Sequence, residues 1–138
     1  DHDPDTSPYP SVREYGTGLR LTAREVSDYL AMYQPDPALR TVPLVSPLAA
    51  EDLSGQPRTL IVTAELDLLR DEGEAYGRAL RAAGNSVRIE RVDGALHGFI
   101  ALPRFSRALT QGYQQVASFL DGDMTDSRPL DAPDRTDP

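Results

Sequence analysis

The chain has 138 residues, with 22 acidic and 14 basic side chains and no cysteine. This length is enough for one domain with a single core. The lack of cysteine excludes disulfides, thiol nucleophiles and thiolate metal sites. A net charge of −8 argues against nucleic acid as a partner, because phosphate binding needs a basic surface.

No apolar run approaches the roughly 18 residues that a membrane span needs. The first residues are acidic and do not resemble a secretory signal sequence. We therefore expect no membrane span and a cytoplasmic location.

The negative charge is concentrated at the two ends. Residues 1–5 contain three Asp, and residues 121–138 contain six Asp and two Arg, so the ends hold −7 of the net −8. Both ends are also rich in Pro and poor in large apolar side chains, which leaves little to offset the entropy of ordering. We predict a flexible acidic segment over residues 1–18 and a disordered acidic tail over residues 121–138.

Helical and extended patterns alternate between these ends. Thr22 and Glu25 form a capping box that begins a predicted helix over residues 22–33, and a Pro-rich connection follows over residues 34–58. The run 59–64 (TLIVTA) is apolar without alternation, which is typical of a strand buried on both faces.

A second helix and a second strand follow. Acidic residues at the start, arginines at the end and Gly84 as a stop predict a helix over residues 71–83. The alternation over residues 86–92 predicts a strand with one exposed face near a sheet edge. Apolar residues at helical spacing predict a closing helix; they are Phe105, Leu109, Tyr113, Val116 and Leu120.

Residues 59–92 thus form one predicted βαβ unit, with two parallel strands joined by a right-handed crossover. A parallel sheet is normally covered on both faces and contains more than two strands. We therefore predict an α/β fold that is incomplete within this chain, consisting of the last two parallel strands and flanking helices.

Two polar residues follow the predicted strands at the end where open α/β sheets bind ligands, Asp67 after the first strand and His97 after the second. A carboxylate can accept a hydrogen bond from one ring nitrogen of a histidine, fix its tautomer and stabilise the imidazolium. A histidine can act as base and acid around neutral pH. The alternative is that Asp67 caps the next helix and His97 is an ordinary loop histidine.

Four motifs stand in order between positions 45 and 99: Ser46-Pro47-Leu48, Glu65-Leu66-Asp67 with Leu69-Arg70-Asp71-Glu72-Gly73, Ala82-Ala83-Gly84, and His97-Gly98-Phe99. Together they resemble the C-terminal part of the hormone-sensitive-lipase-like branch of the α/β-hydrolases. The resemblance implies a carboxylic-ester hydrolase for short-chain acyl esters, with a triad in the order nucleophile, acid, histidine. It also implies that Asp67 is the triad acid and His97 the general base.

The same resemblance divides the chain. Residues 19–120 correspond to the C-terminal part of a hydrolase domain, and residues 19–45 look like the segment that helps to cover the acyl pocket. Phe99 and Ile100 are expected to line that pocket, with plain core packing as the alternative. Leu68 stands where relatives usually have Pro, which is a mild change beside Asp67.

The family's nucleophile is missing from this chain. None of its nine serines is flanked by Gly at both −2 and +2, and no His-Gly-Gly oxyanion motif occurs. Loss of a triad member typically costs about 10⁴ to 10⁶ in rate. Our hypothesis is that an upstream hydrolase segment carries the serine and the oxyanion hole, that a small-molecule ester is the substrate, and that this chain alone is inactive.

The rival hypothesis is a non-catalytic, hydrolase-derived binding or interaction module. Its exposed strand would pair with a partner or with a second copy as a homo-oligomer. Neither hypothesis involves a cofactor, because no Gly-rich phosphate loop or Cys/His zinc pattern occurs. His2, Asp3 and Asp5 could ligate a metal, but a flexible terminus loses too much entropy on ordering, so we expect no metal site.

Overall fold

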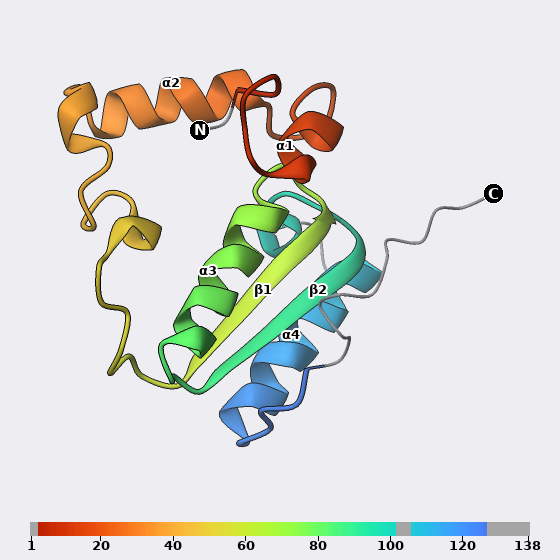
Figure 1. Ribbon diagram of the computed structural model, residues 1–138. Helices are drawn as coiled ribbons and strands as arrows, with labels where there is room; N and C mark the ends of the chain where they lie inside the picture. The colour runs from red at the N-terminus through yellow and green to blue at the C-terminus, as the bar shows by residue number, and fades with distance from the viewer. Residues whose placement is uncertain (1–2, 102–105, 127–138) are drawn as a thin grey trace.

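The computed structural model describes residues 3–101 and 106–126 (Figure 1). The main elements in chain order are α1 (Pro10–Tyr15), α2 (Ala23–Tyr33), β1 (Thr59–Leu66), α3 (Arg70–Ala82), β2 (Val87–Leu96) and α4 (Arg107–Leu120). Short 3-10 turns lie at Pro37–Leu39, Pro47–Ala49 and Phe99–Ala101. No helix within the described residues is long and apolar enough to cross a bilayer.

The sheet consists of β1 and β2 in parallel. Their register runs from Thr59 opposite Val87 to Ala64 opposite Val92, and an irregularity precedes the last pair. Over the described ranges the sheet has these two strands, so the outer edge of β1 carries no strand. The predicted βαβ unit and the α/β fold class are confirmed.

Helices cover both faces of this sheet (Figure 1). α3 packs on the face that presents Ile61 and Ile89, and a Cβ placed on Gly77 would lie only 2.5 Å from Ile89 Cδ1. The helix therefore needs a glycine at its closest approach to the strands. On the other face, α4 and the turn at Phe99–Ala101 cover a second cluster of buried side chains: Ala64, Val92, Ala95 and Phe99.

The burial of the two strands is the reverse of the prediction. The sequence predicts burial of residues 59–64 on both faces, but only the last two of them are buried. It predicts an exposed polar face for residues 86–92, yet Arg88 and Glu90 are only 3% and 1% exposed. Arg88 Nε donates to Glu90 Oε1 at 2.9 Å, so the two charges neutralise each other beneath α4.

The N-terminal residues are more ordered than predicted. Thr22 and Glu25 form the expected capping box at the start of α2. Before it, α1 packs against α3, and its residues Ser11 and Val12 are fully buried. The prediction of a flexible segment over residues 1–18 is therefore wrong for α1, because a short helix and two buried side chains anchor it.

The chain after α4 is also anchored at first. Asp126 Oδ1 accepts a hydrogen bond from the Ile89 backbone N–H at 3.0 Å, and the carboxylate forms an ion pair with Arg81. The prediction of a disordered tail is therefore wrong for residues 121–126. Residues 127–138 lie outside the described residues.

The closing helix begins where a serine caps it. Ser106 Oγ accepts from the Leu109 N–H at 3.4 Å. Leu109 is buried, as the predicted apolar stripe requires, whereas Tyr113 and Leu120 are exposed. Phe105, the first residue of the predicted stripe, lies outside the described residues.

Candidate active site

Asp67 and His97 meet at one end of the sheet. Asp67 follows the last residue of β1, and His97 follows the last residue of β2. Because the strands are parallel, both residues emerge at the same edge. The structure brings them into contact, with His97 Nδ1 2.8 Å from Asp67 Oδ2.

The two side chains differ in exposure. The Asp67 side chain is 11% exposed, and its second oxygen accepts from the Leu69 N–H at 3.0 Å. Asp67 therefore binds both the loop that follows it and the histidine. The His97 side chain is 39% exposed.

This contact determines what the imidazole can do. With the Asp67 carboxylate as acceptor, Nδ1 carries the proton and Nε2 keeps its lone pair. In residues 3–101 and 106–126 no group hydrogen-bonds to Nε2 of His97. The ring is therefore oriented to take a proton from a group that approaches the Nε2 side.

A cavity of about 310 Å³ adjoins the pair. Asp67, His97, Phe99 and Ile100 all line it, as do residues from both faces of β1: Ile61, Val62, Thr63 and Ala64. Because side chains on both faces contribute, the cavity extends along the outer edge of β1.

Phe99 and Ile100 contribute to the cavity in different ways. Phe99 is buried in the core cluster beneath α4, where a Cβ on Gly112 would lie 2.6 Å from its ring. It therefore packs in the core and lines the cavity at once. Ile100 is exposed, so its side chain is free to contact a molecule in the cavity.

The predicted cap-like segment, residues 19–45, lies at the same end of the sheet. Its residues Leu21 and Ala23 pack against Leu68, the neighbour of Asp67. Leu68 is almost fully buried, so its side chain fills space beneath this segment. A larger hollow of about 690 Å³ lies between α2, the connection after it and α3.

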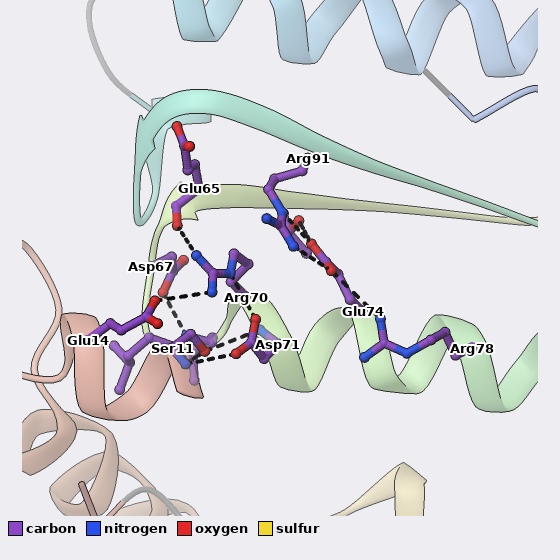
Figure 2. Close-up of polar contacts among 12 residues, drawn as sticks. Ser11, Glu14, Glu65, Asp67, Arg70, Asp71, Glu74, Arg78 and Arg91 are labelled. Carbon is purple, nitrogen blue, oxygen red and sulfur yellow. Dashed lines mark hydrogen bonds and ion pairs between the residues drawn. The ribbon is translucent and has the colours of Figure 1, made fainter. Parts of the chain in front are cut away.

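The loop after β1 is anchored by Arg70 and Asp71, which belong to the motif quoted above, together with residues of α1. Arg70 is buried, and its guanidinium donates to Asp71 Oδ1 at 2.8 Å and to the Glu65 carbonyl at 3.1 Å (Figure 2). From α1, Glu14 accepts from Arg70 Nη2 at 3.3 Å, and the Tyr15 ring lies 5.3 Å from the guanidinium carbon.

Asp71 completes this cluster. Burial alone would raise the pKa of Asp71, but hydrogen bonds from the Arg70 side chain and the Ser11 N–H, with the charges of Arg70 and Arg91, hold the pKa below its ordinary value. Asp71 is therefore a carboxylate that its surroundings keep ionised.

No serine in residues 3–101 or 106–126 hydrogen-bonds to the His97 ring. The described site thus contains an oriented acid–base pair and a cavity.

Known proteins share this arrangement of elements. The family model described as the alpha/beta hydrolase fold matches residues 2–101. An arylesterase from Saccharolobus solfataricus is 44% identical over 101 residues, covering 72% of this chain and 33% of the relative. The carboxylic ester hydrolase LipN from Mycobacterium tuberculosis is 40% identical over 114 residues, covering 80% and 30%.

Solved structures agree. A hyperthermophilic esterase from Pyrobaculum calidifontis superposes with a TM-score of 0.79 and 32% identity, covering 87% of this chain and 39% of that one. A fungal esterase from Rhizomucor miehei gives a TM-score of 0.78 and 33% identity, covering 86% and 37%. The chain spans about a third of the length of the curated relatives it matches. The two relatives named above are an arylesterase and a carboxylic ester hydrolase. The chain therefore belongs to the α/β-hydrolase fold family and, within it, to the hormone-sensitive-lipase-like branch.

Proposed function

We propose that this chain supplies the acid and the general base of a serine carboxylic-ester hydrolase. The observation that carries the proposal is the 2.8 Å contact between His97 Nδ1 and Asp67 Oδ2 beside a cavity. The relatives named as arylesterase and carboxylic ester hydrolase support the same reaction class. The nucleophilic serine and the oxyanion-hole donors would lie on an upstream segment outside this sequence.

The chemistry follows from the orientation of the pair. His97 Nε2 removes the proton of the serine hydroxyl as its oxygen attacks the ester carbonyl, and Asp67 stabilises the imidazolium. The imidazolium then protonates the departing alcohol, which leaves an acyl-enzyme. In the second half, Nε2 takes a proton from water as the water oxygen attacks the acyl carbonyl, and the imidazolium then protonates the leaving serine oxygen, which releases the carboxylic acid and the free serine.

The outer edge of β1 is where the upstream segment would join. That edge carries no strand within the described residues, and the cavity extends along it. A volume of about 310 Å³ suits a short acyl chain, which Phe99 and Ile100 would contact. Homo-oligomerisation and a cytoplasmic location stay predictions.

The test uses this chain alone and the longer polypeptide in which the upstream coding sequence precedes it. We expect hydrolysis of p-nitrophenyl acetate by the longer polypeptide and only background hydrolysis by this chain. In the longer polypeptide, His97→Ala should lower kcat by about 10⁴ to 10⁶, and Asp67→Asn by about 10⁴. His2→Ala changes the other histidine and serves as the matched control.

Two results would contradict the proposal: an inactive longer polypeptide, or equal activity in wild type and His97→Ala. The rival, a non-catalytic binding module, is favoured by the open edge of β1. It predicts a cooperatively folded chain that pairs through this edge, and a longer polypeptide that a fluorophosphonate probe does not label.

A further inference from the structure

A single buried hydroxyl holds the loop that carries Asp67. We call residues 66–69 the acid loop. Ser11 of α1 is 0% exposed, and its Oγ donates to the Leu68 carbonyl at 2.8 Å. The same oxygen accepts from the Asp71 N–H at 3.2 Å (Figure 2). The hydroxyl therefore bridges the end of the acid loop and the first turn of α3.

This bridge does the work of a helix cap. The residue at the N-cap position of α3 is Leu69, which offers no side-chain hydrogen bond. The first N–H groups of a helix have no partner within the helix and need an external acceptor. Ser11 supplies that acceptor from 60 positions earlier. Its own N–H donates to Asp71 Oδ2 at 2.8 Å, so the pairing is reciprocal, as in a capping box.

The other side of Asp67 is held by Arg70, the first residue of α3. Arg70 Nη1 donates to the Glu65 carbonyl, and Arg70 Nη2 pairs with Glu14 of α1. The carbonyls of Glu65 and Leu68 lie on either side of Asp67 in the chain, and groups connected to α1 bind both. The backbone on one side of Asp67 is therefore held directly by α1, through Ser11, and on the other side by Arg70 of α3, which in turn pairs with Glu14 of α1.

We propose that Ser11 is a positioning residue for the Asp67–His97 pair, acting through the Leu68 carbonyl and the Asp71 N–H. The inference rests on the proposed function. Catalytic groups must lie within about 0.5 Å of the productive geometry, and a displacement of about 1 Å costs about 10²-fold in rate. Without the Ser11 hydroxyl, the acid loop loses its bridge to α3, and the Asp67 carboxylate is no longer held against Nδ1.

The decisive variant is Ser11→Ala, and the chain offers a matched control. Ser118 Oγ also donates one hydrogen bond, to Asp123 Oδ2 at 2.8 Å, and accepts one, from Arg88 Nη1 at 3.0 Å. Arg88 is the second residue of β2, so Ser118 lies at the opposite end of the sheet from Asp67. Ser118→Ala therefore removes the same group and the same number of bonds away from the site.

The first readout is the ring ¹⁵N chemical shifts of His97 in this chain, which report the tautomer, with His2 as internal reference. We expect the Nδ1-protonated tautomer in wild type and Ser118→Ala. In Ser11→Ala the ¹⁵N shifts of the His97 ring should move toward those of a mixture of tautomers. The change should have the same direction as the change that Asp67→Asn causes. Identical shifts in Ser11→Ala and Ser118→Ala would overturn the inference.

The second readout is activity of the longer polypeptide on p-nitrophenyl acetate. Ser11→Ala should lower kcat about 10- to 100-fold with little change in KM, since orientation rather than binding is lost. When Ser11→Ala is added to Asp67→Asn, the further loss of kcat should be much smaller, because both changes act through the contact between Asp67 and His97. An equal loss in both backgrounds would overturn the inference.

The design separates this inference from the proposed function. If Asp67→Asn leaves the His97 shifts unchanged, the pair itself is absent and the proposed function fails. If Asp67→Asn changes them and Ser11→Ala does not, only the role of Ser11 fails. Should Ser11→Ala not fold, Ser11→Cys keeps a side chain of similar size with a weaker donor and is held to the same comparison.

Discussion

Within the described residues each strand of the sheet has one outer edge, and the two edges have different surroundings. At β2, the Ile89 N–H donates to the Asp126 carboxylate, which Arg81 holds in place. At β1, the outer edge carries no strand in the described ranges and borders the cavity beside Asp67. A side-chain carboxylate therefore binds the outer edge of β2, whereas the outer edge of β1 borders a cavity beside the candidate site.

The difference extends to the side chains. β2 buries the charged pair Arg88 and Glu90 under α4, where Gln115 and Ser118 also bind the guanidinium. β1 carries mostly apolar side chains, yet its first four residues are only half-buried. The first half of β2 is therefore more deeply buried than that of β1, and β1 keeps apolar surface accessible. This teaches that burial follows the neighbours a strand has more than the polarity of its residues.

The largest expected effect comes from breaking the charged pair of β2. Arg88→Met leaves the Glu90 carboxylate buried without the guanidinium, which typically costs about 3–5 kcal/mol. Urea denaturation should show this loss in the free energy of unfolding. The double variant Arg88→Met/Glu90→Leu should recover part of it, because no buried charge then remains. A single variant with the wild-type midpoint would show that β2 does not depend on this pair.

A direct comparison of the two strands uses one residue type at paired positions. Ile61 of β1 and Ile89 of β2 are opposite each other, and both face Gly77 of α3. Ile89 is fully buried, so Ile89→Ala should cost about 2–5 kcal/mol. Ile61 is half-buried, so Ile61→Ala should cost less in the same urea titration. Equal losses in the free energy of unfolding would mean that the two isoleucines are equally well packed, although β1 has no neighbour on its outer edge within the described residues.

These contrasts show what the sequence could predict of the fold. Periodicity and caps located β1, α3 and β2 to within a few residues, because turn and cap signals such as Gly84 are local. Burial was predicted from polarity, and it failed at Arg88 and Glu90, since their pairing depends on each other and on the covering helix. That the sheet is incomplete could be predicted, because parallel sheets normally contain more than two strands.

Of the residues around the candidate site, some could likewise be predicted from the sequence and one could not. The contact between Asp67 and His97 could be predicted, because each follows a strand end and parallel strands place those ends together. Ser11 was missed because it lies in a Pro-rich segment that looked flexible. The available signal was indirect: Leu69 stands at the N-cap of α3 and has no side-chain acceptor, so the first N–H groups of the helix need an acceptor from elsewhere in the chain or from water.

A smaller effect should follow from opening the edge of β2. Asp126→Ala leaves the Ile89 N–H and the Arg81 guanidinium without this carboxylate, which should cost about 1–3 kcal/mol. The freed edge can then pair with another chain. Size-exclusion chromatography at increasing protein concentration should show more self-association than in the wild type. An unchanged elution profile would indicate that the Asp126 contact does not close this edge.

The smallest effect concerns Asp71, which joins α3 to α1 beside the open strand. Its pKa lies below the usual 3.8, because the hydrogen bonds and charges around it outweigh its burial. A carboxyl whose pKa is lower in the folded state stabilises the fold above its unfolded pKa and loses that contribution as the pH falls through the folded value. The advantage of wild type over Asp71→Asn in free energy of unfolding should therefore be constant near neutral pH and shrink below about pH 4. Urea titrations from pH 6 to pH 3 measure this difference, with Asp28→Asn on exposed α2 as the control. A wild-type advantage that persists unchanged at pH 3 would mean that Asp71 acts through shape rather than charge.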